Sequence, residues 1–114
     1  MNQDAVPEIT ATELNRRLGA DDVPVLVDVR EPHEPGIADL PQHGQVLIPT
    51  GEFMDRISEL EPESEIVLYC RSGARSEWAA KLLLQAGFSS VLNLRGGVLR
   101  SEEHTSELQS HLNL

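Results

Sequence analysis

The chain has 114 residues, the size of one ordinary domain, and a formal net charge of -10 at neutral pH. This excess of acidic residues argues against non-specific nucleic-acid binding, which depends on contacts with phosphates. Apolar residues make up 39% of the chain and charged residues 25%, which is typical of a globular protein. We therefore expect one folded domain that does not bind nucleic acid.

Cys70 is the only cysteine, so the chain can form neither an internal disulfide nor an all-cysteine metal site. This cysteine usage favours a reducing compartment. The first residues lack the pattern of a secretion signal, and the longest wholly apolar run, residues 66–70, is too short to span a bilayer. The sequence predicts a cytoplasmic protein without a membrane segment, in which Cys70 is structural or reactive.

Short runs of apolar residues alternate along the chain with segments in which the apolar residues have the spacing of a helix. The runs predict strands at residues 25–29, 46–48, 66–70 and 91–94. Helices are expected over residues 11–18, from Phe53 to Pro62, and from Ser76 to Gly87. A capping box formed by Thr10 and Glu13 would begin the first helix, and Gly87 would end the third as a left-handed C-cap. This alternation predicts a parallel α/β sheet with crossover helices.

The charge is unevenly distributed along the chain. Residues 1–65 hold 4 Lys or Arg and 15 Asp or Glu, whereas residues 66–99 hold 4 and 1. The second segment is locally cationic and contains Cys70. Charge asymmetry by itself concerns solubility as readily as chemistry, so it becomes informative only beside the cysteine.

Cys70 closes an apolar run, and the residues after it lead directly into a predicted helix. They are Arg71, Ser72, Gly73, Ala74, Arg75 and Ser76. Ligands of open α/β sheets bind at the carboxyl ends of strands, and a glycine-bearing turn into a helix can direct several N–H groups at one anion. Such donors can lower the pKa of a thiol from about 8.5 to roughly 3.5–7.5. The pattern predicts that Cys70 is a nucleophile activated without a histidine base.

The competing interpretation is a structural cysteine, because free cysteine is among the most buried residue types. Arg71 and Arg75, one on each side of Gly73, favour the reactive interpretation. Arg75, at the loop-to-helix junction, is the better candidate for a guanidinium that faces an anion, and Arg71 fits a solvated surface residue equally well. Ser76 either donates to the site or caps the following helix.

Three blocks of the sequence, taken together, are specific enough to indicate a protein family. They are Cys-Arg-Ser-Gly-Ala-Arg-Ser at 70–76, Val-Asp-Val-Arg-Glu-Pro-His-Glu at 27–34 and Asn-Leu-Arg-Gly-Gly-Val at 93–98. In this order and spacing they resemble a single rhodanese (sulfurtransferase) domain over about residues 8–99. The chain is similar to stand-alone rhodanese domains and to those fused behind adenylyltransferases of molybdopterin or thiamine synthesis. Residues 1–7 would then be an N-terminal extension.

The resemblance implies a three-layer α/β/α fold with a mostly parallel sheet of about five strands. It also implies that Cys70 takes sulfane sulfur as a persulfide from a small anionic donor such as thiosulfate. The acceptor would be a thiol or a sulfur-carrier protein, and no metal or organic cofactor is implied. The residues from Arg71 to Ser76 would form the substrate-binding loop, whose amides hold the outer sulfur.

Supporting roles come from the two flanking blocks of the resemblance. Asp28 and Arg30 would form a buried ion pair or anchor a loop, and Glu34 would anchor the long loop that follows it. Arg95 and Gly96 would line the mouth of the site, although a tight turn explains Gly96 equally well.

Two segments depart from the family pattern. The long loop carries an apparent two-residue insertion, Gln42-His43. Just before this insertion, at residues 38–41, the chain lacks the histidine that the family usually has. Residues 100–114 resemble the in-frame translation of a sequencing-library adapter, so we expect a non-native tail after a truncated domain. No catalytic or metal role is assigned to the histidines of this tail.

Two other functions remain open at this stage. A cysteine phosphatase or arsenate reductase also uses a cysteine-to-arginine loop, but typically with five residues between the two, whereas residues 71–74 supply four. The tighter loop suits a single sulfur atom better than a phosphate. A rhodanese-like binding module without turnover is the second alternative, and such modules commonly lack the cysteine that is present here.

Overall fold

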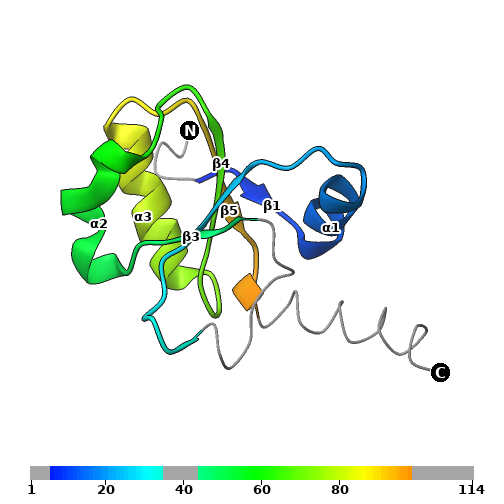
Figure 1. Cartoon of the computed structure of the whole chain (residues 1–114), viewed down its shortest axis with the longest axis horizontal. Helices are drawn as coiled ribbons and strands as arrows, with labels where there is room; N and C mark the ends of the chain where they lie inside the picture. Colours follow the sequence, from blue (N-terminus) through cyan, green and yellow to red (C-terminus); the bar gives the residue numbers. More distant parts are fainter. Residues whose placement is uncertain (1–5, 35–43, 99–114) are drawn as a thin grey trace.

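A five-stranded sheet forms the centre of the computed structural model, which describes residues 6–34 and 44–98 (Figure 1). The elements in chain order are β1 (Glu8–Ile9), α1 (Ala11–Gly19), β2 (Val25–Asp28), β3 (Val46–Leu47), α2 (Thr50–Arg56), the 3-10 turn η2 (Ile57–Glu59), β4 (Glu65–Tyr69), α3 (Ala74–Gln85) and β5 (Ser90–Leu94). The strand order is β1-β5-β4-β2-β3, and all four pairings are parallel. Parallel pairing places the carboxyl ends of these strands at one edge of the sheet.

The sheet separates two hydrophobic clusters, one on each face. One contains Leu14 and Leu18 of α1, and the other contains Phe53 of α2 and Leu83 of α3. Figure 1 shows α1 on one side of the strands and α2 with α3 on the other. These layers confirm the predicted α/β/α architecture.

Strand β4 lies at the centre of the sheet and contributes to both clusters. Ile66 and Leu68 belong with Cys70 to the cluster under α2 and α3, while Val67 and Tyr69 belong to the cluster under α1. The period-two alternation of a strand therefore directs Cys70 toward α3. This is the helix whose first turn follows the cysteine in sequence.

The structure confirms the predicted strands and corrects several boundaries. It adds β1, a two-residue strand that is too short for a periodicity signal. The predicted second helix ends at Arg56 and tightens into the η2 turn, and α3 begins two residues earlier than expected, at Ala74. The Gln42-His43 insertion, residues 1–5 of the N-terminal extension and the adapter-like tail lie outside the described residues.

The two predicted helix caps are present, one of them in part. The Thr10 hydroxyl accepts a hydrogen bond from the Glu13 amide at 3.1 Å, but the Glu13 carboxylate pairs with Arg16 and does not return to Thr10. Gly87 has a φ of 98°, and the next amide bonds back to the carbonyl of Leu83. None of the described helices is long and apolar enough to cross a membrane.

A buried ion pair holds the end of β2 against the end of β4. The Arg30 guanidinium donates to both carboxylate oxygens of Asp28 at 2.9 Å, and the guanidinium carbon lies 5.6 Å from the centre of the Tyr69 ring. Both charged side chains are almost fully buried. The expected buried pair is therefore present, and it sits beside the residue that precedes Cys70 in the chain.

Removing one partner of this pair should destabilise the fold strongly. Asp28→Ala leaves a buried guanidinium without its carboxylate, a change that costs about 3–5 kcal/mol. Glu13→Ala, which breaks the exposed pair with Arg16, should cost far less, because solvent screens the charges of an exposed pair. Urea unfolding gives both free energies, and equal costs would contradict a stabilising role for the buried pair.

Candidate active site

Cys70 follows β4 directly, at the carboxyl edge of the sheet, and is 1% exposed. Its sulfur accepts a hydrogen bond from the Gly73 amide at 3.0 Å and one from the Ser76 hydroxyl at 3.4 Å. Residues 70–76 therefore wrap around the sulfur atom and place donors on it. This is the arrangement that the sequence predicts for the loop.

Two opposing effects act on the ionisation of Cys70. Burial, the largest single effect, raises the pKa of the thiol because it removes the thiolate from water. Hydrogen bonds together outweigh burial and hold the pKa below its ordinary value. They come from the Ser76 hydroxyl and from the backbone amides of Ser76, Gly73 and Ser72.

Gly73 makes the sharp turn between the strand and the helix. Its φ is 108°, a left-handed conformation that favours glycine, and a Cβ at this position would lie 3.4 Å from the Gly96 nitrogen. It occupies the N-cap position of α3. Ser76 is therefore not the helix cap, which is the alternative that the sequence left open; it is buried inside the first turn and faces the sulfur.

Asn93 is a polar neighbour of the loop that the sequence analysis did not select. Its side chain, on β5, accepts from the Ser76 hydroxyl at 2.5 Å and donates to the Gly73 carbonyl at 3.1 Å. It is 2% exposed. The available signal was one amide within the otherwise apolar run at residues 91–94, because a buried amide needs hydrogen-bond partners.

Arg75 points to a partner within the chain. Its two terminal nitrogens donate to the two carboxylate oxygens of Glu34, each at 2.9 Å. The sequence predicted an anion-facing guanidinium; the anion that it faces in this structure is Glu34. Glu34 also accepts from the Glu31 amide at 2.7 Å. It thus joins the beginning of the long loop to α3, as expected for an anchor.

The side chains of the remaining predicted site residues are exposed. Arg71, Ser72 and Ala74 are exposed on the outer side of the loop. Arg95 is also exposed and pairs with Glu8 of β1 at 3.0 Å. Two arginines of the cationic segment therefore have carboxylate partners within the chain. The positive charges of Arg75 and Arg95 are compensated by carboxylates from the first third of the chain.

Gly97 packs directly against the backbone of the cysteine loop. A Cβ there would lie 2.3 Å from the Cys70 carbonyl oxygen and 2.6 Å from the carbonyl group of Arg71. The next amide, of Val98, donates to the Cys70 carbonyl at 2.9 Å. The turn at residues 96–97 is therefore a support for the loop, and Gly96 contributes its backbone rather than a side chain.

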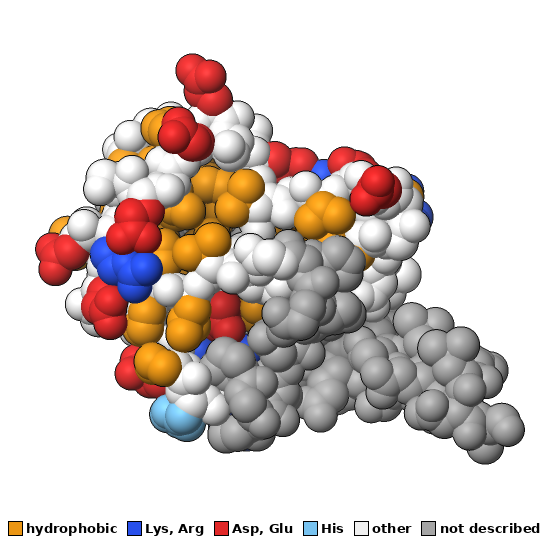
Figure 2. All heavy atoms as spheres, in the orientation of Figure 1, with side chains coloured by type: hydrophobic (Ala, Val, Ile, Leu, Met, Phe, Trp, Pro, Cys, Tyr) orange, Lys and Arg blue, Asp and Glu red, His pale blue; other side chains and the backbone are white. Residues whose placement is uncertain are grey.

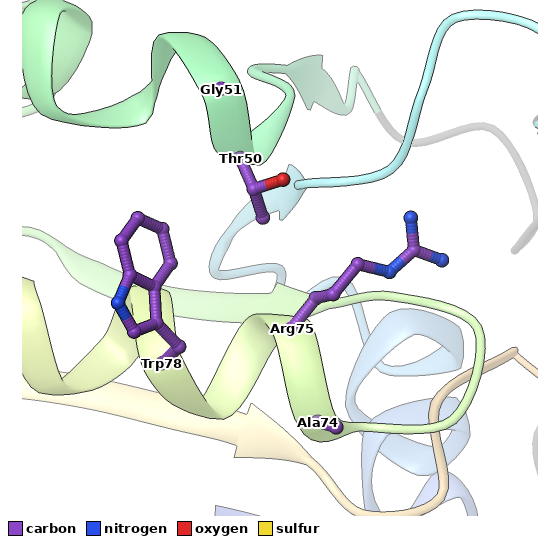
Figure 3. Close-up of a pocket in the computed structure, with 5 residues that line it drawn as sticks. All are labelled: Thr50, Gly51, Ala74, Arg75 and Trp78. Carbon is purple, nitrogen blue, oxygen red and sulfur yellow. The ribbon is translucent and has the colours of Figure 1, made fainter.

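An open pocket of about 430 Å³ adjoins the loop on the α2 side. Figure 3 shows Arg75 and Trp78 extending from α3 toward the start of α2, with Thr50 opposite them. Figure 2 shows apolar and charged side chains mixed on the face of α2 and α3; the exposed large apolar residues of these helices are Met54 and Trp78. The pocket therefore has an apolar wall beside Arg75, whose positive charge is paired with Glu34.

The described residues contain no group of three or more His, Cys, Asp or Glu side chains that could hold a metal ion. The chemistry that this part of the chain offers is that of a buried thiol with a lowered pKa. It is surrounded by neutral hydrogen-bond donors rather than by a histidine base. Such a sulfur is an activated nucleophile.

Comparison with known proteins agrees with this geometry. Residues 10–103 match the rhodanese-like domain family. The chain belongs to this family. A rhodanese-related protein from Thermoplasma volcanium has a solved structure that superposes with a TM-score of 0.76 at 26% identity, covering 86% of this chain and 92% of that one. The rhodanese fold is thereby established.

Relatives of known sequence include both stand-alone and fused proteins. A sulfurtransferase of Allochromatium vinosum is 41% identical, covering 87% of this chain and 91% of its own length. The candidate sulfur carrier protein YrkF of Bacillus subtilis is 37% identical over 85% of this chain and 51% of its own length. MoeZ of Mycobacterium tuberculosis, named for an inferred adenylyltransferase/sulfurtransferase activity, is 34% identical over 80% of this chain and 23% of its own.

The close approach of Gly97 predicts a steric effect on the site. Gly97→Ala should destabilise the protein by more than about 1 kcal/mol, the usual cost of a left-handed conformation alone, because its Cβ would also displace the Cys70 and Arg71 carbonyls. Gly19→Ala is the control, since nothing lies within 4 Å of a Cβ there. Urea unfolding measures both, and equal stability of the two variants would contradict the packing.

The Glu34–Arg75 pair predicts a pH dependence of stability. Hydrogen bonds from Arg75 lower the pKa of Glu34 to about 2, against an unfolded value of about 4.3. A carboxyl with a lowered folded pKa stabilises the fold above its unfolded pKa, and this contribution is lost as the pH falls toward the folded pKa. The stability difference between the parent and Glu34→Gln should therefore shrink from about pH 4.3 toward about pH 2.

Urea titrations at several pH values measure this difference. Glu63→Gln removes the same charge from an exposed surface residue and serves as the control. A difference between the parent and Glu34→Gln that stays constant over this pH range would contradict an ion pair that forms only with the ionised carboxyl.

Proposed function

We propose that this chain is a sulfurtransferase in which Cys70 carries sulfane sulfur as a persulfide. The observation that carries the proposal is the convergence of hydrogen-bond donors from Gly73 and Ser76 on the Cys70 sulfur, with a pKa below the ordinary value. Family membership and a relative named as a sulfurtransferase support a rhodanese-type enzyme. A structural cysteine has no need of such donors.

The reaction proceeds in two displacements at sulfur. The Cys70 thiolate attacks the outer sulfur of a donor such as thiosulfate, a new S–S bond forms, and sulfite leaves with the electron pair of the broken S–S bond. A thiophilic acceptor such as cyanide then attacks the outer sulfur of the persulfide. Thiocyanate leaves and the thiolate is restored, so no external oxidant, reductant or cofactor is required.

The loop suits the charge changes of this cycle. The Cys70 sulfur itself carries the negative charge in the thiolate, and the outer, transferred sulfur carries it in the persulfide. The backbone amides of Ser72, Gly73 and Ser76 can donate to either atom without a proton transfer, which makes them a fixed environment for the anion. Arg71, Ser72 and Ala74 on the exposed side of the loop are where a donor would first arrive.

The pocket beside α3 is proposed as the approach route for the partner molecules. It is lined by Thr50, Gly51, Ala74, Arg75 and Trp78. A small anionic donor would meet Arg75 there, and the acceptor would be a small thiol or a sulfur-carrier protein, a partner class to which the relative YrkF points. The reduced thiol that this cycle needs fits the expected cytoplasmic compartment.

The phosphatase alternative is less favoured by the site. The loop between Cys70 and Arg75 is tighter than the five-residue loop that is typical of such enzymes. Only four residues separate Cys70 from that arginine. A binding module without turnover does not account for a cysteine whose pKa is lowered by hydrogen bonds.

Intact-mass analysis tests the persulfide directly. After incubation with thiosulfate, the parent protein should gain the mass of one sulfur atom, and cyanide should remove it with formation of thiocyanate. Cys70→Ser should show neither change, because the sulfur nucleophile is absent. Its fold should survive, since serine is nearly isosteric and can still accept from the Gly73 amide.

An aryl phosphate serves as the competing substrate in the same preparations. We expect sulfur transfer to exceed phosphate hydrolysis by a wide margin. A parent protein that gains no sulfur, or one that hydrolyses the phosphate as fast as it forms thiocyanate, would overturn the proposed function.

A further inference from the structure

The buried amide of Asn93 is a polar side chain beside the cysteine loop that the sulfur-transfer cycle does not use. It lies on β5 and is paired in the sheet register with Leu68 of β4. Leu68 is two residues before Cys70. Its carbonyl oxygen is 2.5 Å from the Ser76 hydroxyl, and its nitrogen is 3.1 Å from the Gly73 carbonyl. Ser76 and Gly73 both donate hydrogen bonds to the Cys70 sulfur.

We infer that Asn93 is a positioning residue for Cys70: it clamps Ser76 and Gly73 in the geometry that presents their donors to the sulfur. This role deepens the proposed sulfurtransferase function, on which its use in catalysis rests. The hydrogen bonds of the Asn93 side chain go to Ser76 and Gly73 and not to the sulfur. Any effect on the chemistry must therefore pass through the two residues that it holds.

The hydrogen bond from Asn93 to the Gly73 carbonyl helps to position the backbone amides that donate to the Cys70 sulfur. Glycine can adopt many conformations, and the turn requires one of them, with a φ of 108°. The Asn93 amide and the Glu77 amide of α3 both donate to the Gly73 carbonyl, at 3.1 and 3.0 Å. Without the Asn93 contact, the Gly73 carbonyl loses the donor that ties the turn to β5.

The Ser76 contact acts in two directions. A hydroxyl has one proton, and that proton has three acceptors within reach: Asn93 at 2.5 Å, Gly73 at 3.3 Å and Cys70 at 3.4 Å. Asn93 fixes the position of the oxygen but also competes with the sulfur for the proton. The competition concerns one donor, whereas the clamp also maintains the amides of Ser72, Gly73 and Ser76, so the clamp should dominate.

Asn93→Leu tests this role, because leucine has a similar volume, removes both hydrogen bonds and suits a strand that already contains leucines. The readout is the pH dependence of Cys70 alkylation by iodoacetamide, which measures the thiolate without any sulfur donor. We expect the midpoint to rise by about half a unit, equivalent to about threefold less thiolate below both midpoints. Val91→Ala, a buried change on the same strand, should lower stability and leave the midpoint unmoved.

Ser76→Ala, alone and combined with Asn93→Leu, tests whether Asn93 acts on the sulfur through Ser76. If Asn93 acts through Ser76, the shift in the double variant should be smaller than the sum of the two single shifts. Additive shifts would overturn that route. An unchanged midpoint in Asn93→Leu would make Asn93 merely structural, and a lowered midpoint would make it a competitor for the proton; either result overturns the positioning role.

The proposed function can fail separately from this inference. If thiosulfate leaves no sulfur on the parent protein but the alkylation midpoint still rises in Asn93→Leu, the positioning role stands and the sulfurtransferase function does not. If the parent accepts sulfur and the midpoint is unchanged, the reverse holds.

Discussion

The site depends on the balance between burial of the Cys70 sulfur and the hydrogen bonds that converge on it. A thiolate removed from water is unstable unless donors replace the solvent, and here the donors are the hydroxyl of Ser76 and amides of the loop. These groups are close to the sulfur because Cys70 directly follows β4 and α3 begins four residues after Cys70. The parallel sheet and the sharp turn at Gly73 are thus requirements of the chemistry as well as of the fold.

Two neighbouring strands stabilise the loop from opposite sides. On the β2 side, the Asp28–Arg30 pair packs on Tyr69, and the Val29 amide bonds to the Tyr69 carbonyl at 3.1 Å. On the β5 side, Asn93 and the Gly97 turn contact the loop itself. The reacting atom therefore sits on a rigid frame built from residues far apart in the chain. Precise placement of this kind is what a site with few functional groups requires.

The sequence predicted local features of the site better than its long-range contacts. Cys70, the glycine turn and the following helix lie within seven residues, so the order of the residues already implied their arrangement. Both Glu34 and Arg75 were selected as site residues, but a separation of 41 residues hid their pairing. Asn93 was missed because periodicity marks apolar residues, and a single amide in an apolar strand carries no information about which hydroxyl it will meet. The end of the second helix was also missed, because the change to the η2 turn is not visible in the spacing of Phe53, Ile57 and Leu60.

The strand lengths have a consequence for association. Strands β1 and β3 form the two edges of the sheet, and each has only two residues. A long exposed edge presents a row of unpaired N–H and C=O groups on which another polypeptide can add a strand, and very short edge strands are one way in which proteins prevent this. The longer strands β2, β4 and β5 each have a neighbour on both sides, and the central strand β4 is paired with β2 and β5 along most of its length. This sheet therefore offers little template for edge-to-edge aggregation, even though its central strands are apolar enough to aggregate if they were exposed.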